Sequence, residues 1–266
     1  MYLHLLDLVD ADFPEMVAAQ WEAFETPYQG ILHAVCPIFD NDRAASLADN
    51  TQRQLKEHRE AGSASHWVKV VDVDAGNKIV GAARWLVYEK NPFTEASGDR
   101  DRDSGPVADW FLENSVEREY VSRLIAQIGA GRMKFARRPH LCIQLMHRTL
   151  DLYSAFTIPK YRCAGVGTLL TQWGLEKADN MGLECWLEAS RMGYGLYKSN
   201  GFNPVCELPL DPSMPDNLSK EDQAALKRLR GLIQPPVHYT LMWRPRGGQY
   251  TEGVTVKLWE AESDSD

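Results

Sequence analysis

The feature that most constrains this chain is a glycine-containing turn between an expected strand and an expected helix. Residues 150–158 are rich in apolar, aromatic and β-branched side chains, which predicts a strand that ends at Pro159. Apolar residues at helical spacing begin at Val166 and predict an amphipathic helix. Between the two, Gly165 and Gly167 allow the backbone to turn sharply and to lie close to a ligand.

Such a turn indicates a site for a phosphate or a diphosphate. The amides of a helix's first turn are unpaired, and they lie at the positive end of the helix dipole. A turn without any ligand is the alternative, because many folds use one. The standard nucleotide-binding patterns do not fit. The chain has no Gly-x-x-x-x-Gly-Lys-Ser/Thr, and Leu170 stands where Gly-x-Gly-x-x-Gly needs its last glycine.

A second segment decides between these alternatives. Residues 183–190 predict a short strand, and residues 191–202 predict a short helix closed by Asn200-Gly201. Together the two segments resemble the acyl-CoA-binding half of the GNAT superfamily of N-acetyltransferases. The superfamily's Gln/Arg-x-x-Gly-x-Gly/Ala signature is present as Arg162-Cys163-Ala164-Gly165-Val166-Gly167, and its Leu-Tyr-x-x-x-Gly-Phe element as Leu196-Tyr197-Lys198-Ser199-Asn200-Gly201-Phe202. The resemblance covers residues 145–206.

The resemblance implies a mixed α/β fold with a splayed, mostly antiparallel central sheet and helices on both faces. It implies one GNAT-like domain over residues 1–246, followed by an acidic extension at 247–266 that is expected to be partly disordered. About 60 residues separate the expected third and fourth strands, where the superfamily usually has a short turn, so residues 89–139 are read as an insertion. A lid, a subunit contact and extra packing are all open for it.

The implied activity is transfer of an acetyl group from acetyl-CoA, as co-substrate and without a metal, to an amine. The amine attacks directly in a ternary complex, and a small-molecule acceptor is expected. Two alternatives stay open. One is a transferase that uses another acyl-CoA or a hydroxyl acceptor, and the other is a non-catalytic acyl-CoA-binding protein.

The resemblance also implies the cofactor site residue by residue. Amides of the strand at 156–158 would polarise the thioester carbonyl, and amides of 162–168 would hold the diphosphate. The expected cofactor-binding residues are Phe156, Thr157, Ile158, Arg162, Cys163, Ala164, Gly165, Val166, Gly167, Thr168, Ser190 and Tyr197.

Catalysis calls for a general base, because an alkyl ammonium with a pKa of about 10.4 must lose a proton before it attacks. Asp151 is the first candidate. It precedes Arg162 by eleven residues, about the register at which histone-acetylating members carry a basic glutamate. A surface carboxylate or a partner for Arg148 is the alternative. Glu188 is the second candidate and His147 the third.

Tyr197 is the expected proton donor. In the superfamily the tyrosine of this short helix commonly hydrogen-bonds the CoA sulfur and protonates the leaving thiolate. A phenol suits this role because it can donate a proton and is neutral at working pH. The alternative is that its ring only packs beside Phe202. Tyr194 offers another hydroxyl one turn earlier.

The rest of the chain supplies further elements. Strands are expected at residues 2–9, 66–73, 78–88, 203–210 and 237–243, and helices after Asp10 or Asp12, at 40–60, at 107–128 and at 220–232. The 107–128 helix is expected to end at Gly129-Ala-Gly131, and Ser219 to open the last helix as a capping box. Trp21, Phe24 and Tyr28 are expected to border the acceptor or to pack in the core.

Composition limits the partners. The chain has 266 residues, 44% hydrophobic and 25% charged, which is ordinary for a soluble globular protein. A net charge of −8 argues against a nucleic-acid surface, gives no support to a membrane role, and mildly favours a cationic acceptor. Five scattered cysteines indicate free thiols, and no apolar run approaches the roughly 20 residues that cross a bilayer. A cytoplasmic location is therefore expected, and the oligomeric state is open.

Overall fold

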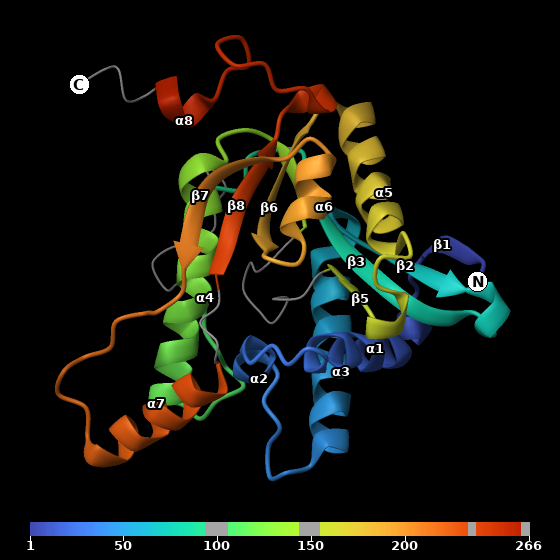
Figure 1. Ribbon diagram of the computed structural model, residues 1–266. Coiled ribbons are helices and arrows are strands. Elements are labelled where there is room, and N and C mark those ends of the chain that lie inside the picture. Colours follow the sequence, from blue (N-terminus) through green and yellow to red (C-terminus); the bar gives the residue numbers. More distant parts are fainter. Residues whose placement is uncertain (94–105, 144–154, 234–237, 262–266) are drawn as a thin grey trace.

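The computed structural model describes residues 1–93, 106–143, 155–233 and 238–261. Its centre is an eight-stranded sheet in the order β1-β2-β3-β4-β6-β8-β7, with β5 paired to β3 (Figure 1). The strands are β1 (Leu3–Asp7), β2 (Ser65–Asp72), β3 (Lys78–Tyr88), β4 (His140–Ile143), β5 (Ala155–Thr157), β6 (Glu184–Ser190), β7 (Asn203–Pro209) and β8 (His238–Arg244). Strands β4 and β6 are parallel, and the other described pairings are antiparallel. The predicted mixed α/β fold is confirmed.

Helices cover both faces of the sheet. They are α1 (Phe13–Glu25), α2 (Ile31–Val35), α3 (Arg43–Ala61), α4 (Val116–Phe135), α5 (Val166–Met181), α6 (Tyr194–Ser199), α7 (Lys220–Leu232) and α8 (Leu258–Ala261). Adjacent residues of β3 show the two layers, because neighbours on a strand point to opposite faces. The indole Nε1 of Trp85 donates to the carbonyl of Leu170 in α5 at 3.2 Å, whereas Arg84 lies 3.8 Å from Glu57 of α3. Helix α4 lies on the α3 side.

Helix α3 starts later than the sequence predicts, whereas helix α1 starts after Asp12, one of the two expected positions. Helix α3 is capped by Asp42, whose carboxylate accepts the amide of Ala45 at 2.9 Å, because Asp40 and Asn41 have φ of 53° and 56° and form the turn before it. Helix α1 has Asp12 at its N-cap, but that carboxylate accepts the amide of Val9 at 2.8 Å instead of a helix amide.

Helix α4 begins and ends later than predicted. It starts after Ser115, whose hydroxyl accepts the amide of Arg118 at 3.2 Å, and it runs through Gly129 and Gly131. The predicted end at these glycines is wrong because Gly131 serves packing. A Cβ there would lie 3.1 Å from Leu241, so glycine lets the helix approach the sheet closely.

The chain beyond residue 246 contributes to the core on the α4 side. Trp259 packs edge-on against Trp186 and Trp243, with ring centroids 5.2 and 5.0 Å apart. Glu184, also buried, accepts both of their indole N–H groups, at 2.9 Å from Trp186 and 3.2 Å from Trp243. The described part of the extension therefore completes an aromatic layer.

Candidate active site

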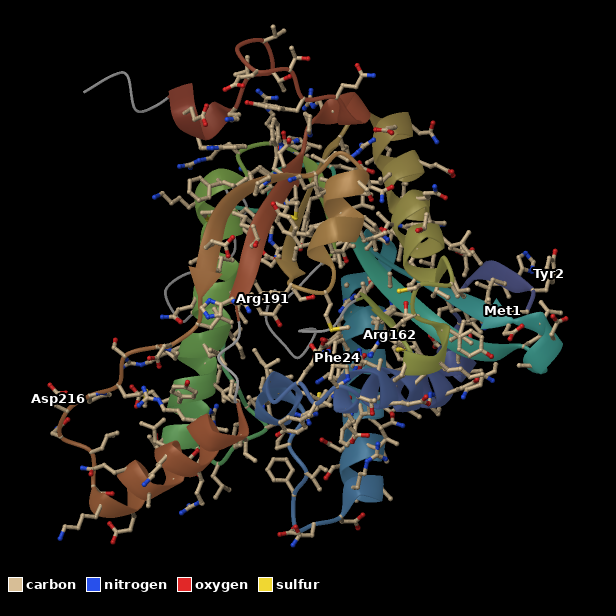
Figure 2. The ribbon with its side chains drawn as sticks, in the orientation of Figure 1. Met1, Tyr2, Phe24, Arg162, Arg191 and Asp216 are labelled. Atoms are coloured by element: carbon tan, nitrogen blue, oxygen red, sulfur yellow. The ribbon has the colours of Figure 1, made fainter. Side chains whose placement is uncertain are left out.

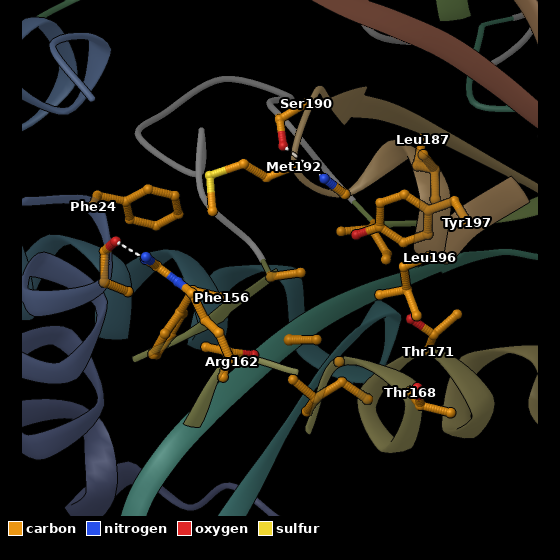
Figure 3. Close-up of a pocket in the computed structure, with 18 of the residues that line it drawn as sticks. Phe24, Phe156, Arg162, Thr168, Thr171, Leu187, Ser190, Met192, Leu196 and Tyr197 are labelled. Carbon is orange, nitrogen blue, oxygen red and sulfur yellow. Dashed lines mark hydrogen bonds between the residues drawn. The ribbon is translucent and has the colours of Figure 1, made fainter. Parts of the chain in front are cut away.

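A gap in the sheet sets the position of the site. Strand β3 pairs with β4 through Trp85–Tyr88 and with β5 through Gly81–Ala83. Strand β6 follows β4 in parallel as far as Trp186, opposite Cys142, and its continuation has no described pairing with β5. A cavity of about 540 Å³ opens there, with β5 on one side and the end of β6 on the other (Figure 3).

The turn before α5 presents unpaired main-chain N–H groups to this cavity. Gly165, with φ of 90°, is the N-cap of α5, and Cys163 also has a positive φ of 60°. Among the described residues, none accepts a hydrogen bond from the main-chain amides of Cys163, Gly165, Val166, Gly167 and Thr168. They lie at the positive end of a 16-residue helix. This arrangement fits a diphosphate group, because it offers several donors and a favourable dipole at one point.

Two amides of the same turn already donate hydrogen bonds within the chain. The amide of Arg162 donates to the carbonyl of Pro159 at 3.3 Å, and that of Ala164 to the carbonyl of Tyr161 at 3.3 Å. The side chain of Arg162 donates to the carbonyl of Ala23 at 2.6 Å, in the last turn of α1. It therefore ties the turn to α1, beside Phe24 (Figure 2).

On β5 the geometry narrows the expected thioester-binding amides to one. The amide of Ile158 donates to the carbonyl of Val80 at 3.0 Å, so it is not free. The amides of successive residues in a strand point in alternate directions. The amide of Phe156 therefore also points to β3, and the amide of Thr157 points toward the gap. Of the predicted residues, Ile158 and Val166 are buried in the core and, like Ala164, do not line the cavity.

Tyr197 lies on α6 where the cavity meets β6. Its ring packs against Phe202 with centroids 5.7 Å apart, and its hydroxyl end points toward the middle of the pocket (Figure 3). No hydrogen bond joins this hydroxyl to a described residue. Burial raises the pKa of Tyr197 to about 12, so the phenol stays protonated at neutral pH. A neutral donor therefore faces the cavity.

Glu188 lines the cavity, but its carboxylate does not face the cavity as a general base would need to. Its side chain has no exposed surface, and its Oε1 lies 3.4 Å from Nε of Arg132 on α4. Burial raises the pKa of Glu188, and the Arg132 charge opposes that rise without cancelling it. The carboxylate is thus sealed from the pocket, which only the rest of the residue borders. Asp151 and His147, the other candidate bases, lie outside the described residues.

Several lining residues were not among the predicted site residues. Thr171 follows Thr168 by three positions on α5, so helical spacing alone places both on one face (Figure 3). Tyr239 lies opposite Ser190 in the register of β8 with β6, which the sequence does not reveal.

Two residues that the sequence did single out also line the cavity. Of the aromatic residues expected to border the acceptor or to pack in the core, Phe24 lines the cavity. Trp21 is buried beside Asn50, and the hydroxyl of Tyr28 donates to the carbonyl of Leu232. Ser190, an expected cofactor-binding residue, lines the cavity too, and its hydroxyl accepts the amide of Gly193 at 3.3 Å.

The sequence predicts no metal site and no membrane-spanning helix, and the structure bears on both only over residues 1–93, 106–143, 155–233 and 238–261. No group of three or more His, Cys, Asp or Glu side chains there is placed to hold a metal ion. None of the helices there combines the length and the apolarity that crossing a bilayer demands.

No family model matches the sequence, and no curated protein sequence matches it either. Solved structures do match. A histone acetyltransferase HPA2 and related acetyltransferase from Corynebacterium glutamicum is 20% identical, with 95% of this chain and 99% of that one covered and a TM-score of 0.51. Arylalkylamine N-acetyltransferase 2 from Aedes aegypti is 12% identical over 92% and 99%, with a TM-score of 0.56. A polyamine N-acetyltransferase from Drosophila melanogaster is 10% identical over 91% and 98%, with a TM-score of 0.54.

These likenesses define the fold of the chain, which is that of the N-acetyltransferases it aligns with. The fold that the resemblance implies is confirmed over nearly the whole chain.

Proposed function

We propose that this protein is an acetyl-CoA-dependent N-acetyltransferase that acts on the amine of a small molecule, in a ternary complex. The observation that carries the proposal is the set of unpaired amides around Gly165, which opens on the gap between β5 and β6. The two solved acetyltransferases named for arylalkylamine and polyamine acceptors support a small amine as acceptor. When bound, acetyl-CoA would supply an activated acetyl group as a thioester.

The residues have distinct proposed roles. The amides of Cys163, Gly165 and the first turn of α5 bind the diphosphate, and the hydroxyl of Thr168 adds a donor. The amide of Thr157 points at the gap and stabilises negative charge on a carbonyl oxygen held there. Tyr197 donates a hydrogen bond, and finally a proton, to the sulfur that leaves. Asp151 is kept as the proposed base, because the carboxylate of Glu188 is sealed by Arg132.

We assign this activity to a single domain over residues 1–246 that carries the 89–139 insertion, in a cytoplasmic protein. The described part of the extension, residues 247–261, supports that domain through Trp259 and does not line the cavity.

The proposal is tested by release of free CoA thiol from acetyl-CoA with a panel of small amines, alongside calorimetric binding of CoA. We expect binding of CoA and amine-dependent thiol release. Binding without release for any acceptor would favour a non-catalytic acyl-CoA-binding protein. Release with alcohols alone would favour an O-acyltransferase, and the absence of binding would refute the proposal.

Tyr197→Phe examines the proton donor. It is expected to lower kcat by about 100-fold, the scale of one general acid, and to leave CoA affinity unchanged. Tyr194→Phe is the matched control, because Tyr194 lies on the same helix but does not line the cavity. Equal losses in both variants would contradict the assigned role of Tyr197.

A further inference from the structure

Tyr197 and Tyr239 both line the cavity, and they come from opposite faces of the sheet (Figure 3 shows Tyr197). Tyr197 belongs to α6, which lies on the same face as α5. A Cβ at Gly167, in the first turn of α5, would lie 3.0 Å from Leu196 of α6. The turn before α5 presents its unpaired amides on this face. Under the proposed function, the cofactor therefore approaches the gap from the side of Tyr197.

Tyr239 lies on the other face, which α4 covers. Residues that pair across two strands point to one face of a sheet, as do residues two apart on a strand. Leu208 pairs with Tyr239, and Leu241 follows it by two positions on β8. Both leucines contact α4, since they would lie 3.3 and 3.1 Å from a Cβ at Gly131. Phe24, from α1 on the same face, lines the cavity as well, so the cavity reaches both faces of the sheet.

The hydroxyl of Tyr239 is open to this cavity. The residue is 4% exposed, and no hydrogen bond joins its hydroxyl to a described residue. The oxygen is also not one of the unbonded polar atoms that are sealed from solvent, as both carboxylate oxygens of Glu188 are. Because Tyr239 lines the cavity, its accessible oxygen belongs to the cavity wall. Tyr161 lines the cavity too, but its hydroxyl donates to Asp72 at 2.9 Å.

A neutral phenol suits an attacking amine at this position. Burial and, after it, the charge of Glu188 raise the pKa of Tyr239, so the hydroxyl stays protonated at neutral pH. When an amine attacks, the lone pair of its nitrogen is directed at the thioester carbonyl. Only the N–H groups of that nitrogen are then left to be held, and a phenolic oxygen can accept a hydrogen bond from one of them.

We propose that Tyr239 holds the acceptor amine: its hydroxyl oxygen accepts a hydrogen bond from the nitrogen, whose lone pair is thereby directed at the gap beside β5. This inference rests on the proposed function and deepens it, because it assigns one tyrosine to each substrate. Tyr197 meets the sulfur that leaves on the α5 face, and Tyr239 meets the nitrogen that attacks from the α4 face. No covalent bond is made or broken at Tyr239.

Tyr239→Phe removes the hydroxyl and keeps the ring. The probe is the amine that releases most thiol from acetyl-CoA among phenethylamine, 1,4-diaminobutane and the rest of the panel. We expect KM for this amine to rise about fivefold, the scale of one hydrogen bond. The value of kcat should change by less than about twofold, because the bond is present both before and during attack. CoA affinity by calorimetry and Tm should be unchanged.

Thr240→Val is the matched control for this variant. Thr240 is the next residue on β8, so it points to the opposite face, where its hydroxyl donates to Glu207 at 3.0 Å. Its replacement should leave KM for the amine unchanged. In a double variant, Tyr197→Phe with Tyr239→Phe, the loss of kcat should equal that of Tyr197→Phe and the rise of KM that of Tyr239→Phe, because the two hydroxyls act on different substrates.

An unchanged KM for the amine in Tyr239→Phe would overturn the inference. A loss confined to kcat would overturn it too, since Tyr239 would then be a proton donor like Tyr197. A matching loss of CoA affinity would place Tyr239 on the cofactor instead. Each of these results leaves acetyl transfer by the parent chain intact. A parent chain that releases no thiol with any amine would refute the proposed function, and this inference with it.

Discussion

The buried pair of Arg132 and Glu188 allows a sharp prediction about stability. The two side chains are 4% and 0% exposed, and Nε and Oε1 are 3.4 Å apart. Both carboxylate oxygens and Nε also lack a hydrogen-bond partner among the described residues. The charges therefore depend on one another to offset their lost hydration.

Arg132→Met would leave the carboxylate of Glu188 alone in the core. We expect the free energy of unfolding to fall by about 3–5 kcal/mol, the usual cost of breaking a buried pair from one side. At this chain length 1 kcal/mol corresponds to about 2–4 °C, so Tm should fall by roughly 6–20 °C in a thermal melt followed by circular dichroism.

The double variant, Arg132→Met with Glu188→Leu, is expected to be more stable than Arg132→Met alone. It removes both charges and leaves apolar groups of similar length, a change that is often neutral or stabilising by about 1–4 kcal/mol. The second substitution therefore rescues the first, which simple loss of packing would not produce.

The pH dependence gives an independent check. In Arg132→Met the pKa of Glu188 should lie higher than in the parent chain, because burial is no longer opposed by a cation. The folded state then binds a proton that the unfolded state, with a carboxyl pKa of about 4.3, has released. Stability should accordingly fall as pH rises above about 4.3 through the folded pKa, and be constant beyond it. The double variant should lack this slope. If Arg132→Met loses less than about 1 kcal/mol of unfolding free energy and shows no pH slope, the Arg132–Glu188 pair is not buried away from water and the reasoning is refuted.

Two further predictions concern the turn and the aromatic layer. Gly165→Ala forces a residue with a Cβ to adopt φ of 90°, at a cost of about 1–2 kcal/mol. It should weaken CoA binding about tenfold, as measured by calorimetry. Gly129→Ala, at an open helical position, is the control and should leave binding unchanged. Trp259→Ala should lower the free energy of unfolding by about 2–4 kcal/mol in urea titrations, because it empties the space beside Trp186 and Trp243. If the free energy of unfolding of Trp259→Ala lies within about 0.5 kcal/mol of the parent value, as for an ordinary surface substitution, residues beyond 246 do not complete the core.

Local signals in the sequence predicted much of the fold. Helix α7 begins after Ser219 as expected, because its hydroxyl accepts the amide of Asp222 at 3.0 Å and no distant residue is needed. The turn before α5 was likewise predictable, since a helix N-terminus and two glycines define it within a few residues. The predicted strand at 150–158 is confirmed over Ala155–Thr157, and its first residues lie outside the described ranges.

What the sequence did not reveal depends on tertiary contacts. Strand β4, described over His140–Ile143, is recognised by its pairing with β3 and β6, which the sequence does not show. Glu188 is a reasonable base from its position on β6, but the side chain of Arg132, from α4, covers its carboxylate. Likewise the sequence predicts that the helix ends at Gly131, since glycine often ends a helix. It does not show that Gly131 packs against Leu241, which lies more than a hundred positions away in the chain.

The strand order has a consequence for how the protein is made. Strand β8 lies between β6 and β7 although it follows both in the sequence, so these two strands lack their shared neighbour until residue 244 has left the ribosome. Trp259 emerges later still. The half of the sheet that contains the cavity therefore closes only after β8 has been made, and a nascent chain released before then exposes apolar strand faces to chaperones and to aggregation.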